Sequence, residues 1–209
     1  MNLTRQKYLP VTLSLTVLIL VTGVVQGTWY DSLSGEIRAL FGYSPQHITD
    51  GAWQRIVSSF PLTGDPGHLG AALAMTMFCV GWLELQRGWE VALAVFFASH
   101  ILSAMFEGVI LSQVLFWSGI PQIPWHLALH EVGPSAGYYG CLGTCIFLLP
   151  KTVRGWSVLV IFGWLTVRLL IGMSYSTLEG THIRSDLAHL VAFGFGIAIA
   201  NLFIPRGDP

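Results

Sequence analysis

Long apolar runs, separated by polar breaks, are the feature that most constrains this chain. A helix needs about 20 apolar residues to cross a hydrocarbon core of about 30 Å. Only 10% of the residues are charged and 53% are hydrophobic, whereas a soluble domain carries roughly a quarter charged residues. The sequence therefore predicts an all-α, polytopic membrane protein, a bundle of six transmembrane helices in the lipid bilayer. The predicted spans are residues 9–27, 68–86, 91–117, 135–150, 156–174 and 186–204.

The loops between these spans differ in length and charge. The first, residues 28–67, is long, while the second and fourth are short and basic, with Arg87, Lys151 and Arg154. Basic residues favour the cytoplasmic side, and an inside N-terminus places six basic residues inside and three outside. Both termini are therefore predicted to be cytoplasmic. The first run lacks a clean cleavage pattern and is predicted to be a retained anchor, so we expect a single membrane domain over residues 1–209.

Charge and cysteine content exclude several classes of partner and cofactor. The net charge is −1 and no basic block is present, which argues against nucleic acid as a partner. The three cysteines lie inside apolar runs, so we expect buried, inert thiols rather than disulfides. Third-loop residues His126, His130 and Glu131 lack the His-Glu-x-x-His spacing of a zinc site. We expect no metal and no other cofactor.

One serine and one histidine stand at matching depth in two parallel spans. Ser135 opens the fourth span within the run Gly-Pro-Ser-Ala-Gly at 133–137, and His189 lies in the sixth. At 1.5 Å per residue, each lies roughly 22 Å above the inner end of its predicted helix. A serine hydroxyl needs a base to become a nucleophile, and ionisable groups inside a membrane are usually functional. The pair therefore predicts a nucleophile and its general base.

Small residues recur along both spans, so the two helices can approach closely. Such spacing lets helix backbones pack tightly in lipid, where hydrophobicity cannot hold them together. By itself the pattern is also consistent with a packing seam that has no chemical role. The small residues are Gly133, Ala136, Gly137, Gly140 and Gly143 in the fourth span, and Ala192, Gly196 and Ala200 in the sixth.

Three further residues are candidates for supporting roles. His68 opens the second span at the same outer level, where its N–H can help to stabilise an oxyanion together with backbone N–H groups near Ser135. It can equally be an interfacial histidine hydrated by water. Tyr139 lies one helical turn after Ser135 and can stack on His189 or simply pack. Asp186 precedes His189 by three residues; we expect a helix N-cap, with orientation of the imidazole as the alternative.

Two other classes of protein share parts of this pattern. The run 133–137 also matches Gly-x-Ser-x-Gly, the nucleophile elbow of α/β-hydrolases, but that elbow follows a strand and the sequence predicts none there. Arg168, His100 and Glu107 lie inside apolar runs and can mark a transport path. A transporter more often shows broken helices or inverted repeats, which this sequence lacks.

Over roughly residues 51–203 the chain resembles the rhomboid family of intramembrane serine proteases. The run Gly-Pro-Ser-Ala at 133–136 is similar to the family's Gly-x-Ser-Gly, in which the serine is the nucleophile. Ala188 and His189, followed by Gly196, resemble the pattern of the sixth helix, which carries the catalytic histidine. The run Trp-Gln-Arg at 53–55 is similar to the first-loop Trp-Arg motif, with one inserted residue.

The resemblance implies a six-helix rhomboid-like bundle that cuts transmembrane-anchored protein substrates with Ser135 and His189. It also implies oxyanion or orienting roles for His68, Gly133 and Tyr139, and it implies no cofactor. Where the family usually has an asparagine as an oxyanion donor, this chain has Ala72. The alternatives are a weak or inactive rhomboid-like protein that binds transmembrane helices, and a sorting-type rhomboid acting on C-terminal anchors. The small six-span form is typical of the bacterial plasma membrane.

Overall fold

The computed structural model describes residues 8–111, 130–175 and 181–203. Helical stretches occupy each of the six predicted spans. The first is α1 (Pro10–Val25), and the second runs continuously through α5 (Pro66–Met75), η1 (Thr76–Val80) and α6 (Gly81–Arg87). The third joins α7 (Trp89–Met105) to η2 (Phe106–Leu111). The last three are α10 (Ser135–Phe147), α11 (Lys151–Tyr175) and α12 (Thr181–Phe203).

Among the described residues, four helical stretches are long and apolar enough to cross a membrane. They are Pro66–Arg87, Trp89–Val109, Lys151–Ile171 and Arg184–Leu202. Helix α1 is apolar but has 16 residues, and α10 has 13. A helical membrane protein is therefore confirmed, while the count of six crossings stays a prediction. The predicted end of the third span, at residue 117, lies outside the described residues.

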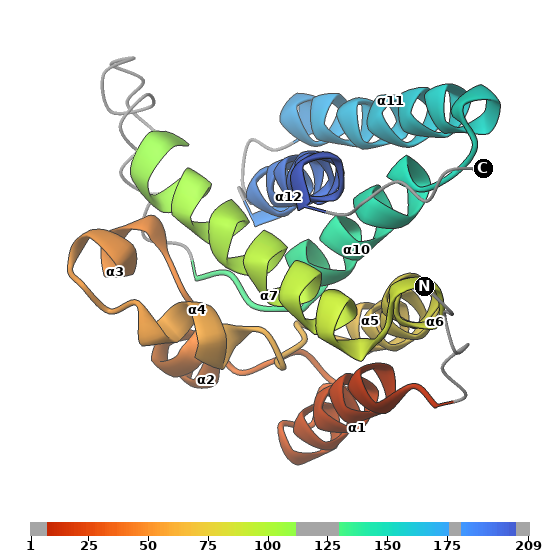
Figure 1. The fold of residues 1–209 in the computed structure, drawn as a ribbon. Coiled ribbons are helices and arrows are strands. Elements are labelled where there is room, and N and C mark those ends of the chain that lie inside the picture. The colour runs from red at the N-terminus through yellow and green to blue at the C-terminus, as the bar shows by residue number, and fades with distance from the viewer. Residues whose placement is uncertain (1–7, 112–129, 176–180, 204–209) are drawn as a thin grey trace.

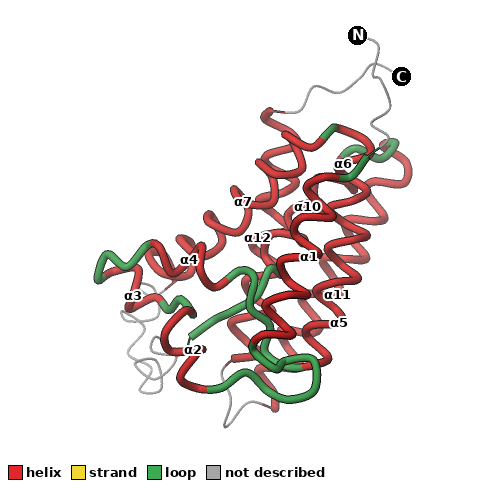
Figure 2. Tube along the Cα trace, turned by 90° about the horizontal axis from the view of Figure 1, so that it is seen from below, coloured by secondary structure: helices red, strands yellow, loops and turns green. Residues whose placement is uncertain are grey.

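The long helices run side by side, and α12 lies among α7, α10 and α11 (Figures 1 and 2). The first loop forms three short helices, α2 (Gly35–Phe41), α3 (Pro45–Thr49) and α4 (Gln54–Ser59), which we call the loop lobe. This lobe flanks α7 near one end of the bundle (Figure 2). The long first loop thus packs onto the membrane helices.

Two helices begin earlier than their apolar runs predict. Helix α11 begins at Lys151 and α12 at Thr181, each five residues before the predicted start. Hydropathy marks the part of a helix that lies in hydrocarbon, whereas the backbone stays helical through polar residues beyond it. Lys151 and Arg154 were expected in a loop but lie in the first turn of α11. Arg154 donates to the Leu149 carbonyl from Nε (3.2 Å) and Nη2 (2.9 Å), which satisfies an acceptor next to the end of α10.

Helices α10 and α12 are in direct backbone contact. A Cβ added at Gly196 would collide with the Gly140 carbonyl, and one at Gly143 would collide with the Phe193 carbonyl. The Thr144 hydroxyl donates to the Gly196 carbonyl oxygen at 2.9 Å. The close approach predicted from the small residues is confirmed, and it places the helices that carry Ser135 and His189 next to each other.

Helix α1 is held to the bundle by a buried carboxylate. Glu84 of α6 is completely buried and accepts hydrogen bonds from Val11 N (3.0 Å), Thr12 N (2.8 Å) and Thr12 Oγ1 (2.7 Å). The first N–H groups of a helix have no acceptor within it, and negative charge at this end is favourable. Glu84 therefore satisfies the start of α1 inside an apolar region.

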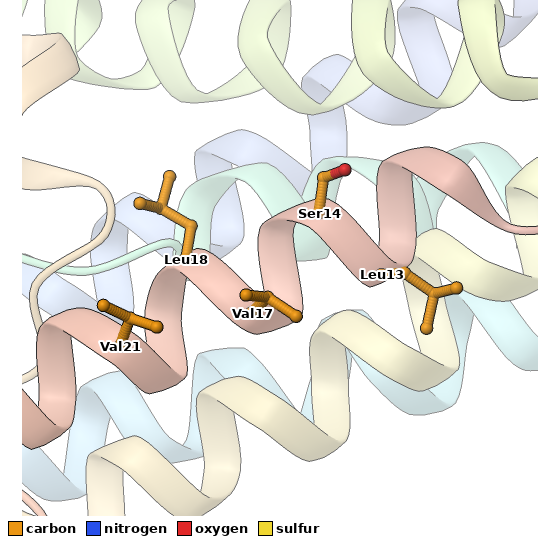
Figure 3. A pocket seen from close by; sticks show the side chains of 5 residues that line it. All are labelled: Leu13, Ser14, Val17, Leu18 and Val21. Carbon is orange, nitrogen blue, oxygen red and sulfur yellow. The ribbon is translucent and has the colours of Figure 1, made fainter.

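The opposite side of α1 is apolar and exposed. Figure 3 shows this face, where a shallow groove is lined by Leu13, Ser14, Val17, Leu18 and Val21. Such a surface would be unfavourable in water, but lipid tails are as apolar as leucine. The groove is consistent with a helix that faces the hydrocarbon of the bilayer.

Candidate active site

A pocket of about 490 Å³ brings together the residues that the sequence singled out. It lies between α5, α10, α11 and α12, and the backbone segments before α5 and α10 close one side. Its lining includes Ser135, His189, His68, Gly133, Tyr139, Ala72, Asp186, Arg168 and Ser185. All of the predicted site residues therefore line one pocket.

Ser135 is the first residue of α10 and follows a tight turn. Gly133 has φ +127°, a conformation that favours glycine, and its N–H donates to the Ser59 carbonyl at 3.0 Å. That N–H is therefore engaged, so Gly133 shapes the turn before Ser135 and does not offer a free donor. The N–H groups of Ser135 and Ala136 lie in the first turn of α10 and have no acceptor within the helix. They are therefore better candidates than Gly133 for donors to a bound oxyanion.

His189 is buried in α12, with 7% of its surface exposed. The ring of Tyr139 stacks on its imidazole, with centroids 4.4 Å apart and planes at 29°. The preceding carbonyl, of Ala188, accepts a hydrogen bond from Ser103 Oγ of α7 at 3.1 Å. The imidazole is thus held from α10, and its helical turn is anchored to α7.

Ser135 and His189 face the same pocket, but no hydrogen bond joins them in the described part of the chain. His189 Nε2 instead lies 3.4 Å from the hydroxyl of Ser185, one turn earlier in α12. Catalytic hydrogen bonds are often loose without substrate and tighten when substrate binds. For Ser135 to give its proton to His189, the imidazole would have to exchange its contact with Ser185 for one with Ser135.

Asp186 is not a helix cap, which corrects the expectation from the sequence. Helix α12 begins at Thr181, so Asp186 lies within the helix, and only 4% of its surface is exposed. Its Oδ1 lies 2.7 Å from Arg168 Nη2 on α11 and 3.7 Å from His189 Nδ1. The sequence pattern did not connect Arg168 with this site. Its signal was an arginine inside an apolar run, a type of residue that is costly in a membrane.

His68 lies at the pocket mouth and is held by the residue that caps its helix. Asp65 accepts a hydrogen bond from His68 N at 2.9 Å, and its other oxygen lies 2.8 Å from His68 Nδ1. The His68 side chain is 62% exposed. With Nδ1–H directed to Asp65, the ring donates from Nε2 only when it is doubly protonated.

The Rhomboid domain model matches residues 50–206, three quarters of the chain. This chain belongs to the rhomboid family. Among curated proteins, none gives a significant match to it. The family resemblance is thus confirmed, and together with the apolar helices it makes this rhomboid protein an integral membrane protein.

The asparagine position of the rhomboid pattern carries Ala72 in the pocket wall. Ala72 is buried, with 2% of its surface exposed, and lies one turn after His68 on α5. A methyl group offers no hydrogen bond to an oxyanion. The pocket of this rhomboid protein therefore has one side-chain donor fewer than the family pattern.

A second polar cluster, which the sequence pattern did not predict, joins the loop lobe to the bundle. Glu107 of η2 is 1% exposed and lies 3.4 Å from the Tyr43 hydroxyl and 3.6 Å from Arg184 Nη2 of α12. The backbones of Tyr43 and Glu131 exchange hydrogen bonds of 3.1 and 2.7 Å. Burial, and then the charge of Glu107, raise the pKa of Tyr43 well above its ordinary value. The phenol therefore stays protonated and can donate to Glu107.

Beside this cluster, two histidines meet on the surface of the loop lobe. The rings of His47 and His130 have centroids 5.0 Å apart, and His47 Nδ1 lies 3.1 Å from Ser44 Oγ. Partial burial lowers the pKa of both imidazoles, with Arg55 adding to the effect at His47 and His47 adding to it at His130. The neutral forms are therefore favoured where the lobe meets the segment before α10.

Proposed function

We propose that this rhomboid protein is an intramembrane serine endopeptidase that cleaves transmembrane-anchored proteins. The observation that carries the proposal is the shared pocket of Ser135 and His189, on two helices in backbone contact. The stacked Tyr139 ring supports it, because a general base must be held in one orientation. A bacterial plasma membrane with both termini in the cytoplasm is the location we propose.

The proposed reaction is acyl transfer to serine. His189 takes the proton of Ser135, whose Oγ attacks the carbonyl carbon of the substrate peptide bond. The protonated imidazole then gives that proton to the leaving amine. Water that enters through the pocket mouth, activated by His189, hydrolyses the acyl-enzyme and releases the second product. No metal or cofactor takes part in these steps.

The oxyanion is stabilised in this proposal by donors at the start of α10. The N–H groups of Ser135 and Ala136 have no acceptor within the helix, and doubly protonated His68 adds a side-chain donor from the pocket mouth. Ala72 adds none. Loss of one oxyanion donor typically costs about 10²–10³ in rate, so we expect a slow or specialised protease.

The second candidate is a rhomboid-like protein that binds transmembrane helices without cutting them. Two observations favour it: Ala72 in the pocket wall, and the contact of His189 Nε2 with Ser185 at 3.4 Å. A sorting-type rhomboid that acts on C-terminal anchors uses the same site chemistry and differs from the first proposal only in its substrates.

A fluorophosphonate probe separates the first two functions, because it reacts only with an activated serine. We expect the wild-type protein to be labelled at Ser135, and labelling to be lost in Ser135→Ala and in His189→Ala. Ser185 is the other hydroxyl beside the imidazole, so Ser185→Ala is the matched control and should still be labelled. Folded protein that binds transmembrane segments but takes up no label would support the inactive binder. Label found on Ser185 would show that Ser185, and not Ser135, is the nucleophile.

A further inference from the structure

We propose that Asp186, itself fixed by Arg168, positions the His189 imidazole, so that the site works as a serine–histidine–aspartate arrangement. Arg168 is on α11, and the other three side chains are on α10 and α12. The inference rests on the proposed function for its catalytic meaning. The arrangement itself can be tested without activity.

The first step of the argument is geometric. Asp186 and His189 are three residues apart on α12, so they lie on the same helical face. Asp186 Oδ1 and His189 Nδ1 are 3.7 Å apart. Both atoms are buried, and apart from the ion pair of Oδ1 with Arg168 neither has a hydrogen-bond partner within the described residues. A shift of less than 1 Å brings them within hydrogen-bond distance.

The second step concerns the cost of burying these groups. A buried carboxylate is strongly unfavourable unless it is paired, and here the pairing charge is Arg168 Nη2 at 2.7 Å. Arg168 also lies over the ring of Trp164, 5.1 Å from its centroid, so its guanidinium is held on two sides. The Trp164 ring thus helps to fix the guanidinium, and the guanidinium in turn favours one position of the Asp186 carboxylate.

The third step is the chemistry at the two imidazole nitrogens. A carboxylate that accepts Nδ1–H fixes the tautomer in which Nε2 carries the lone pair. The Ser135 proton then moves to Nε2, while Asp186 stays ionised and stabilises the imidazolium. The titratable and charged groups that share the pocket with His189 come from every element around it. They are Asp186 on its own helix, Arg168 from α11, Tyr138 and Tyr139 from α10, His68 from α5, Arg38 from α2, and Asp65 and Glu131 from the segments before α5 and α10.

The test compares Asp186→Asn with the wild-type protein in detergent, using the rate at which fluorophosphonate labels Ser135. Loss of the aspartate from a serine–histidine–aspartate triad costs up to about 10⁴ in rate; because the separation here exceeds a hydrogen bond, we expect roughly a 10- to 100-fold loss. The pH at which the labelling rate reaches half its maximum should fall, because a less basic imidazole is neutral at lower pH. Arg168→Gln should lower the labelling rate by a smaller factor, and Arg168→Lys should restore most of the rate.

Asp50→Asn, an exposed change in the loop lobe, is the matched control and should label at the wild-type rate with an unchanged pH profile. Thermal unfolding of each variant measures the folded fraction. If Asp186→Asn lowers the melting temperature yet leaves the labelling rate per folded molecule and the pH profile unchanged, Asp186 only stabilises the packing of α11 against α12. That result would overturn the proposal.

Nitrogen-15 NMR of labelled histidine supplies a readout that does not depend on activity. We expect His189 to carry its proton on Nδ1 in the wild-type protein and to lose this preference in Asp186→Asn. The same tautomer in both proteins would contradict the positioning role. If the wild-type protein takes no label while the tautomer still depends on Asp186, the proposed protease function fails and the positioning role stands.

Discussion

Two buried carboxylates, Glu84 in α6 and Asp186 in α12, show how differently this bundle uses the same chemical group. Glu84 is fully buried and accepts three hydrogen bonds of 2.7 to 3.0 Å from the start of α1. Asp186 is nearly as buried, but its contacts are an ion pair with Arg168 and a longer approach to His189. Both carboxylate oxygens of Glu84 thus accept hydrogen bonds. Asp186 Oδ1 is paired with Arg168 but makes no hydrogen bond within the described residues, and Asp186 lines the pocket.

Burial of a charge in a membrane therefore does not by itself identify a functional residue. A carboxylate whose oxygens are all used by neutral donors holds two helices together. A carboxylate that is held by an ion pair beside an imidazole, without a hydrogen bond of its own, can act on that imidazole. The distinction lies in hydrogen-bond geometry and in the neighbouring pocket.

Removal of the Glu84 carboxylate should have the largest effect on stability. Glu84→Ala leaves two N–H groups and a hydroxyl without partners in an apolar region, at a cost of about 1–3 kcal/mol for each group. We expect a large fall in unfolding free energy, measured by thermal or denaturant unfolding in micelles. The labelling rate of Ser135 per folded molecule should stay near the wild-type value. Equal stability would show that α1 does not depend on this carboxylate.

A change in the seam between α10 and α12 should damage both stability and chemistry. Gly196→Ala places a methyl group against the Gly140 carbonyl, so the helices must separate, at a cost of about 1–3 kcal/mol. The same shift moves His189 relative to Ser135, and the labelling rate should fall. Gly194→Ala, two residues earlier on the same helix, meets nothing within 4 Å and is the control. Equal effects of the two substitutions would contradict the close backbone contact of α10 and α12 at Gly196.

The substitution Ala72→Asn, which restores the family's asparagine, measures how much a side-chain oxyanion donor at this position adds to the rate. Ala72→Asn adds a donor to the pocket wall, and since one such donor is typically worth about 10²–10³ in rate, we expect turnover to rise by about tenfold or more. Ala72→Val, which adds bulk without a donor, should lower it. Cleavage of a fluorogenic transmembrane peptide in micelles measures both. No gain in Ala72→Asn would mean that the existing donors already suffice.

The smallest expected effect is a pH dependence at the loop lobe. The pKa values of His47 and His130 are lowered from 6.5 by burial, so the folded protein binds these protons less readily than the unfolded chain. Their contribution to stability is therefore present above pH 6.5 and decreases as the pH falls through the lowered pKa values. Thermal unfolding between about pH 8 and about pH 5 should show a melting temperature that falls with pH, and this fall should be smaller in His130→Gln. An equal fall of the melting temperature in both proteins would exclude this histidine pair as the source of the pH dependence.

Much of the fold followed from residue patterns, because lipid imposes simple rules. Apolar runs located the helices, and small residues at four-residue steps predicted the close contact around Gly140 and Gly196. Helix ends were less accurate, since polar residues such as Lys151 continue a helix beyond the hydrocarbon. The motif around Ser135 identified the family, whose model matches residues 50–206.

The partners of the site residues could not be predicted from the sequence. Arg168 and Asp186 lie 18 positions apart in the chain, and only the packing of α11 against α12 brings their side chains together. Glu84 and the start of α1 are separated further still, by 72 and 73 positions. Hydropathy assigns such residues a cost but not a partner. Tertiary packing decides which partner each buried charged residue contacts.

The most direct test of the proposed protease function compares the membrane proteomes of cells that carry the wild-type protein or Ser135→Ala at equal abundance. We predict that the wild-type cells release fragments of single-span membrane proteins, cut in or beside the transmembrane segment, and that these fragments are missing in Ser135→Ala. His189→Ala should reproduce the loss. Identical fragment patterns in all three strains, with each protein folded in the membrane, would contradict catalysis by Ser135.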